Sequence, residues 1–400
     1  MTRTAWHLRV GAVVAAWLIA AALSGLRGLV TDVDPWLPVH LLLLGAVSNA
    51  ILVWSSYFAE ALLRLPGKAD RRAEAARLVV FNAGALVVVA GMTGAWWGAV
   101  VVGATLAAGA AVWHGAVLLT RMHRSLPSRF GATVRYYVAA SSFLPVGVAL
   151  GVVMAHVDLD EEMHARVALA HVALNVLGWI GLTVLGTVVT LWPTMLHTQV
   201  ADGAELAARR ALPVLVAAVV VLAAGALAGL AAVAAAGLVG YAAGLVLSGR
   251  ALAQEARRRP PRTYATLSVA AGYLWLTGSV LALAVVVASA GSWATAAEAA
   301  DRLGAPLLVG FAAQVVLGAL SYLVPVVLGG GPTAARATGA ALDTAARTRV
   351  AVVNVGLVVL LGHLPDGVRT VVAAVVLLAL ASFLPLVLRA VVVARRLRAA

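Results

Sequence analysis

One apolar stretch carries residues that could hold a metal-bearing cofactor. It runs from His171 to Pro193 and is long enough to cross a bilayer as a helix. His171, Asn175 and Gly178 are spaced by four and three residues, so they share one helix face. A neutral imidazole there could ligate a metal, and the glycine would let a flat group approach the backbone. The alternative is a histidine whose hydrogen bonds are satisfied inside a helix bundle.

The composition places these residues in a membrane. Of the 400 residues, 63% are apolar and 11% are charged, whereas a soluble protein is about 45–50% apolar and about 25% charged. There is no cysteine, which excludes iron–sulfur clusters, thiolate-ligated haem and disulfide bonds. The first apolar run lacks a small-residue cleavage pattern, so we interpret it as a spanning helix and not as a signal peptide.

Apolar windows predict an all-α integral membrane protein of about 12 transmembrane helices in one bundle. The predicted spans are about 8–30, 36–62, 78–96, 98–120, 136–156, 167–192, 212–230, 232–249, 266–290, 305–329, 350–363 and 368–393. The connections between them are too short for a soluble domain. We therefore expect residues 1–400 to form a single polytopic membrane domain.

The charge of the connections predicts the orientation. Of the 29 Lys and Arg residues, 25 lie at the termini and in alternate connections, which include Arg64, Lys68, Arg129 and residues 257–262. The other connections hold four basic residues and most of the acidic ones, among them residues 158–162. Because basic loops stay on the inner side, both termini are expected to be cytoplasmic. This distribution explains the net charge of +13 without a nucleic-acid partner.

Under this topology the histidines can be sorted by depth. His40 and His171 lie at similar outer depth on different predicted helices, and each is followed on its helix by a glycine, Gly45 or Gly178. Axial ligation of a b-type haem requires two imidazoles that face each other across the porphyrin. We interpret the pair as candidate haem ligands, with packing histidines as the alternative.

Three other histidines are candidate metal ligands. His114 lies inside a predicted span, nearer the cytoplasmic side, and could contribute to a second metal site. His156 and His164 flank four acidic residues in an outer connection and could bind a divalent metal such as copper. The alternative for this connection, which we favour, is a solvated acidic loop.

The first candidate stretch is one copy of an internal sequence repeat. Two glycines and a proline recur with the same spacing at an offset of 132 residues, so that Gly178, Gly186 and Pro193 match Gly310, Gly318 and Pro325. Small residues let helix backbones approach closely, so we expect these glycines to face neighbouring helices. The pattern predicts duplicated units around 167–249 and 305–393. The second copy has Leu303 in place of the histidine, and its polar residue is Gln314.

Several stretches resemble a known family: residues 40–54, 135–140, 171–196 and 306–332. They are similar to actinobacterial membrane proteins distantly related to subunit I of haem–copper oxidases and to NnrS-type haem and copper proteins. In some relatives such a membrane part is joined to a cupredoxin domain like that of copper nitrite reductases. The resemblance implies twelve helices, haem b near the outer face, and nitric oxide, nitrite or oxygen chemistry, with copper as a further candidate cofactor.

The chain departs from this family in its histidines. Active haem–copper oxidases use six, including a pair on the tenth helix and a copper-site cluster on the sixth and seventh. Here the predicted spans 212–230 and 305–329 contain none. A complete binuclear oxidase centre is therefore not expected. This leaves a single haem for electron transfer or ligand sensing, or a scaffold that has lost its haem. Asn175 is expected to support His171 or to contact the porphyrin edge.

Three functions follow from these features. The first is a haem b protein of the cytoplasmic membrane, acting as an oxidoreductase component that exchanges electrons with quinone and with an extracytoplasmic copper or haem protein, or that handles nitric oxide. The second is a twelve-helix secondary transporter, which the repeat also fits. Against it, no predicted span has an acid at its midplane to couple protons. The third is a non-catalytic membrane subunit or assembly factor.

Overall fold

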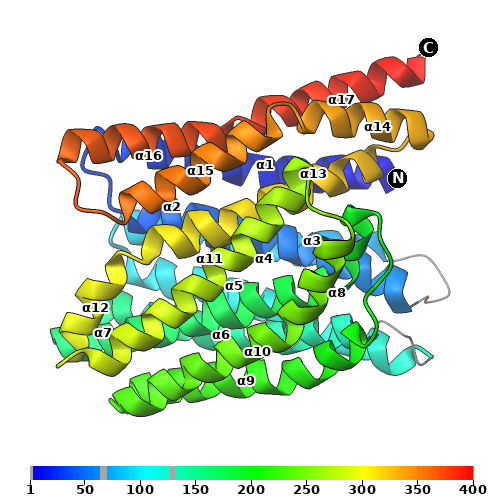
Figure 1. Ribbon diagram of the computed structural model, residues 1–400. Helices are drawn as coiled ribbons and strands as arrows, with labels where there is room; N and C mark the ends of the chain where they lie inside the picture. Colours follow the sequence, from blue (N-terminus) through cyan, green and yellow to red (C-terminus); the bar gives the residue numbers. More distant parts are fainter. Residues whose placement is uncertain (1–2, 64–69, 127–130, 400) are drawn as a thin grey trace. The chain divides into compact units, whose positions relative to one another are not determined.

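The computed structural model describes residues 3–63, 70–126 and 131–399, and within these ranges it contains helices and no strand (Figure 1). Arg64, Lys68 and Arg129 lie outside the described residues. The predicted all-α membrane fold is confirmed, because eleven helical segments in the described ranges are long and apolar enough to cross a bilayer.

The helices match the predicted spans in position, and several of them differ in length from the prediction. In chain order they are α1 (Arg3–Arg27), α2 (Trp36–His40), η1 (Leu41–Val47), α3 (Ser48–Leu63), α4 (Arg71–Thr93), α5 (Trp97–Arg124), α6 (Gly131–His156), α7 (Glu161–Val172), η2 (Ala173–Gly181), α8 (Leu182–Leu196), α9 (Ala204–Leu227), α10 (Ala231–Arg258), α11 (Tyr264–Ser289), α12 (Trp293–Asp301), η3 (Pro306–Ala313), α13 (Gln314–Leu328), α14 (Gly331–Leu342), α15 (Ala346–Leu360), α16 (Asp366–Ala381) and α17 (Phe383–Ala399). The predicted span 350–363 falls on α15, whose 15 residues give a length of about 22 Å, short of a hydrocarbon core of about 30 Å. The predicted span 232–249 falls on α10, which continues to Arg258.

Local sequence explains where two helices begin and how two others are joined by a tight turn. The Asp70 side chain accepts hydrogen bonds from the first free backbone N–H groups of α4. Ser292 forms a capping box at the start of α12. Gly229, with φ of +74°, allows the tight turn that joins α9 to α10. These signals are the ones that set helix ends in water-facing connections.

The chain packs as two compact units. Unit 1 comprises residues 1–50, 260–276 and 304–400, and unit 2 comprises residues 51–259 and 277–303. Each unit is described by itself below. The prediction of a single membrane domain and the proposed extents of the repeated units stay predictions.

Small residues bring helices of unit 2 into close contact. A Cβ atom added at Gly84 of α4 would lie 2.6 Å from the backbone nitrogen of Ala107 in α5. A Cβ atom at Gly225 of α9 would lie 2.6 Å from the backbone nitrogen of Ala234 in α10. Both helix pairs therefore depend on glycine at their crossing points, as is common where helices associate without a hydrophobic driving force.

Three spans contain a π-helical segment: η1, η2 and η3. Such segments disturb the regular hydrogen-bond ladder and occur often at functional sites. Each contains a glycine covered by an aromatic side chain of its own unit, and these pairs are Gly45 with Trp17, Gly178 with Phe143, and Gly310 with Trp275. The side chains of Asn49 and Gln314 donate hydrogen bonds of 2.8 Å and 2.9 Å to the carbonyls of Gly45 and Gly310, which satisfies backbone acceptors at two of the segments.

The two copies of the sequence repeat have matching elements. The helices that follow η2 and η3, α8 and α13, begin and end 132 residues apart, and each contains a late proline. The prediction that the four repeat glycines face neighbouring helices is confirmed, because all are buried against protein. Their nearest side chains are Phe143 for Gly178, Tyr136 for Gly186, Trp275 for Gly310 and Ser268 for Gly318.

Candidate functional site

His171 lies in the last turn of α7, directly before η2, and is partly buried. Its Nδ1 atom is 2.8 Å from the backbone oxygen of Gly147 in α6. A carbonyl oxygen can only accept a hydrogen bond, so Nδ1 must carry the proton. In the neutral ring the lone pair is then on Nε2. This is the arrangement found in metal-bound histidines, whose other ring nitrogen donates to a carbonyl or carboxylate.

Two glycines of α6 form the surface on which His171 rests. A Cβ atom at Gly151 would lie 2.9 Å from Cε1 of His171, and one at Gly147 would lie 2.6 Å from Cγ of Asn175. Asn175 donates a hydrogen bond of 2.9 Å to the backbone oxygen of His171, and its Nδ2 is 3.3 Å from Nδ1 of that residue. Asn175 therefore contacts His171, and its role in supporting a metal ligand stays a prediction.

Gly178 and Gly45 have protein side chains against them. A Cβ atom at Gly178 would meet Cβ and Cγ of Phe143 at 2.8 Å, and one at Gly45 would meet Cδ2 of Trp17 at 2.5 Å. The flat groups that approach these glycines in this structure are thus aromatic rings of the protein. Contact of a cofactor with either glycine stays a prediction, and it would require the ring to move.

His40 ends α2 and directly precedes η1, so both candidate ligands lie beside a π-helical segment. Its Nδ1 atom is 2.8 Å from the backbone oxygen of Trp36, and its ring stacks on the Trp36 indole with centroids 4.1 Å apart. The same reasoning as for His171 puts the proton on Nδ1 and the lone pair of the neutral ring on Nε2. The stacked indole restricts the orientation of the imidazole.

Each of these imidazoles, taken by itself, is the type of donor that a b-type haem uses. The porphyrin supplies four ligands itself, so one or two protein side chains are enough to hold the iron. Across the described ranges, no group of three or more His, Cys, Asp or Glu side chains is arranged to hold a bare metal ion.

The acidic connection at residues 158–162, which is predicted to lie outside, forms hydrogen bonds to the first turns of two helices. Asp160 accepts a hydrogen bond of 2.7 Å from the backbone nitrogen of Met163 and caps α7. Glu162 accepts hydrogen bonds of 2.8 Å and 3.1 Å from the first two backbone N–H groups of α12. His156 stacks on Trp97 with centroids 4.0 Å apart. Two of the acidic side chains thus have structural partners, which supports the interpretation of a loop over that of a copper site.

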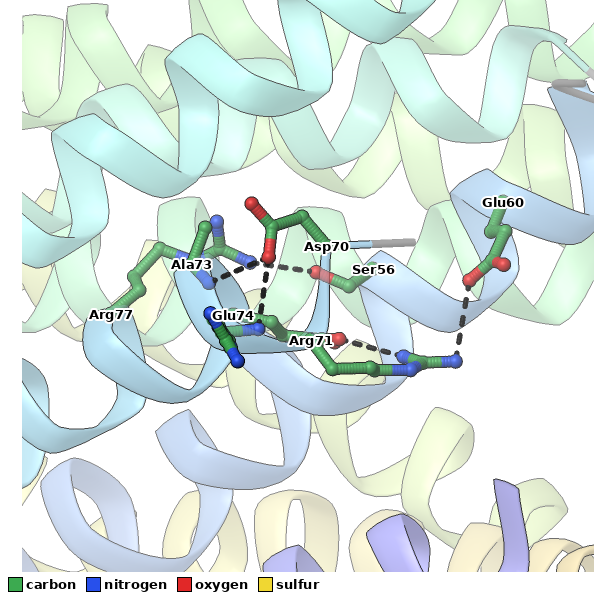
Figure 2. Close-up of polar contacts among 8 residues, drawn as sticks. Ser56, Glu60, Asp70, Arg71, Ala73, Glu74 and Arg77 are labelled. Carbon is green, nitrogen blue, oxygen red and sulfur yellow. Dashed lines mark hydrogen bonds and ion pairs between the residues drawn. The ribbon is translucent and has the colours of Figure 1, made fainter. Parts of the chain in front are cut away.

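A second polar site lies where α3, α4 and α5 meet in unit 2, and sequence reasoning missed most of it. We call it the inner cluster, and its members are Ser55, Ser56, Glu60, Arg71, Glu74, Arg77 and His114. Figure 2 shows five of these side chains, Ser56, Glu60, Arg71, Glu74 and Arg77, around the start of α4, together with the Asp70 cap. Glu74, Arg77 and His114 are 3%, 2% and 1% exposed.

Direct contacts join the members of the inner cluster into three groups. Arg71 lies 2.6 Å from a Glu74 carboxylate oxygen and 3.6 Å from one of Glu60 (Figure 2). Arg77 donates a hydrogen bond of 3.1 Å to the hydroxyl of Ser56. His114, a candidate metal ligand, has its Nε2 atom 2.8 Å from the Ser55 hydroxyl. The positive charge of Arg77 acts on His114, which weighs against a metal cation there.

Glu255 is a further buried acidic residue. The predicted spans leave it in the basic connection between 249 and 266. It is 1% exposed because α10 extends past the predicted span. Its Oε1 atom accepts a hydrogen bond of 2.7 Å from the backbone nitrogen of Ala201, which holds the α8–α9 connection against α10. Beside it is a small cavity lined in part by Ser248 and Ala208, with room for about one water molecule.

Comparison with protein-family models and with curated proteins finds no match to this chain. The geometry of the residues above is therefore the basis for a functional assignment.

Proposed function

We propose that this multi-pass membrane protein binds a b-type haem and carries electrons, with His171 and His40 as the axial ligands expected from the sequence. One observation supports this best. Each of the two histidines has Nδ1 at 2.8 Å from a backbone carbonyl oxygen, so each neutral ring has its lone pair on Nε2. Ionisable residues in spanning segments are costly in a membrane unless they are partnered or serve a function. Both of these histidines also have the tautomer that metal-bound histidines use.

The residues around His171 have defined roles in this proposal. The Gly147 carbonyl orients the imidazole and makes it a stronger donor to iron. Asn175 holds the backbone of the same turn. Phe143, packed on Gly178, keeps water away from this part of the helix pair. A bound haem would supply one-electron transfer between its ferric and ferrous forms.

The proposed partners follow from the predicted topology. Both histidines lie toward the predicted outer ends of their spans, so an extracytoplasmic copper or haem protein could exchange electrons there. Quinone in the bilayer is the proposed second partner. Chemistry on nitric oxide or nitrite is the proposed alternative to electron transfer, as the family resemblance implies, and the cytoplasmic membrane is the proposed location.

Replacement of each histidine tests the proposal. His171→Ala and His40→Ala should each lose haem during purification, because either change removes an iron ligand. His123→Ala, on the predicted inner side, is the control and should retain haem like the wild type. Equal haem content in all four proteins would contradict the assignment of the ligands.

The transporter remains a second candidate, and the inner cluster favours it. Glu74 and Arg77 are charged side chains buried within a spanning helix, and such residues mark ion and proton pathways in transporters. A protein without haem that drives substrate-dependent proton movement in proteoliposomes would support this function. A protein with neither property would fit a membrane subunit or assembly factor.

A further inference from the structure

The inner cluster contains ionisable groups that the haem proposal does not use. Glu60 and Arg71 are its outermost members, with side chains 31% and 27% exposed, whereas the Glu74 side chain is 4% exposed. Arg77 is six residues inside α4, and His114 is ten residues from the inner end of α5. At a rise of about 1.5 Å per residue, the cluster extends from a helix end to a depth of about 15 Å, half of a typical hydrocarbon core.

The hydrogen bonds of Ser55 define the tautomer of His114. The Ser55 hydroxyl lies 2.6 Å from the backbone oxygen of Ile51 and donates its only proton to it. The contact of 2.8 Å between Ser55 and His114 must then be donated by Nε2 of the histidine. The neutral ring consequently has its lone pair on Nδ1, and this buried atom has no hydrogen-bond partner among the described residues.

The same cluster also contains a buried N–H donor, which belongs to Arg77. The Nε atom of Arg77 is also buried and has no partner within the described ranges, while Nη2 of the same side chain donates a hydrogen bond to Ser56, the neighbour of Ser55. A buried lone pair and a buried N–H group both cost free energy when they stay unsatisfied. An internal water satisfies such groups, and it also conducts protons between them and a carboxylate.

Positive charge lies near His114. Arg77 from α4 and Arg121 from α5 itself place positive charge near it, and Glu74 partly offsets the charge of Arg77. From α6, Ser141 packs against Gly115, the residue after His114, and contributes no charge. A neutral ring with a bare Nδ1 is a proton acceptor.

We propose that the inner cluster is a proton path from the predicted inner surface to Nδ1 of His114. A proton enters at the carboxylates of Glu60 and Glu74 and reaches Nδ1 through water. The imidazolium so formed returns to neutral by releasing one proton to water, either from Nδ1 along the same route or from Nε2 while its contact with Ser55 is open. The site therefore binds a proton delivered by water, and its existence does not depend on haem.

Hydrogen exchange at the imidazole tests this path in the full-length protein. The protein is labelled with 15N-histidine, placed in lipid nanodiscs and transferred to D2O, and the His114 ring signal is assigned by its loss in His114→Gln. We expect the ring N–H to exchange at least about tenfold faster than the backbone N–H of the same residue, because the helix amide needs local unfolding. Exchange of the ring no faster than the amide would overturn the proposal.

Two variants locate the route. Glu74→Gln should slow exchange of the ring by about tenfold, since proton transfer through a positioned carboxylate is lost, while the amide rate stays unchanged. Glu161→Gln, an exposed acid at the start of α7, is the matched control and should leave both rates unchanged. A Glu74→Gln ring rate equal to wild type would contradict a path through Glu74. The wild-type comparison holds even if this variant folds poorly.

Discussion

Substitution of Gly147 by alanine perturbs the support of His171 without touching the imidazole itself. The added Cβ atom would lie 2.5 Å from Oδ1 and 2.6 Å from Cγ of Asn175, far inside ordinary contact distance. The Asn175 side chain must move, or α6 and α7 must separate. Separation would lengthen the hydrogen bond of 2.8 Å between His171 and the Gly147 carbonyl.

The size of the effect follows from two terms. Forcing an extra methyl group into a packed contact costs about 1–3 kcal/mol. Loss of a group that orients a metal-bound histidine weakens metal binding by about 10–100-fold, which is about 1.4–2.7 kcal/mol. We therefore expect Gly147→Ala to fold with a lowered Tm and to bind haem at least about tenfold more weakly than wild type.

The matched control is Gly109→Ala in α5, where an added Cβ atom has no neighbour within 4 Å. This change should leave haem binding unchanged and raise stability slightly, because alanine is the better helix former. Haem titration monitored at the Soret band, with thermal unfolding measured on the same samples, separates the two terms. A Gly147→Ala protein with the Tm and haem affinity of the control would refute the reasoning about this contact.

Three further predictions test the topology and the capping groups. Because the chain has no cysteine, single cysteines introduced into 158–162 and 257–262 should be labelled from opposite sides of the membrane, and labelling from one side would contradict the predicted orientation. Glu162→Gln should lower the free energy of unfolding and the Tm, since a charged cap of α12 becomes neutral, and an unchanged Tm would contradict that role. Burial raises the pKa of Asp343, partly offset by its hydrogen bond from Tyr264 and by the charge of Arg349, so its contribution to stability should fall as the pH rises through that pKa. Asp343→Asn should remove this part of the pH dependence of thermal unfolding, and an unchanged pH profile would contradict the prediction.

The helices could be predicted from hydrophobicity, but their ends could not. The apolar run of α10 ends near residue 249, yet the helix continues through Ala251 to Arg258, because this polar segment consists of good helix formers. In contrast, α15 begins at Ala346 after a residue with φ of +52° and ends before Gly362, so it stays short. The π-helical segments have no signal in composition, since they depend on one displaced hydrogen bond.

The candidate site could be predicted only in part. Depth and helical spacing identified His171 and Asn175, which are close in the chain. The support from Gly147 and Gly151 joins segments that are 24 and 20 residues from His171, so only tertiary packing reveals it. Arg77 is one of the 25 basic residues whose distribution predicts the orientation, because arginine near the end of a span is usually exposed. The structure instead buries it between α3, α4 and α5.

The most direct test of the haem proposal is a reduced-minus-oxidised optical spectrum of the wild-type protein, expressed with ample haem and purified in detergent. The proposal predicts a Soret band and the sharp visible bands of a low-spin b-type haem with two imidazole ligands. Protein that is folded and shows no haem bands in this spectrum would contradict it.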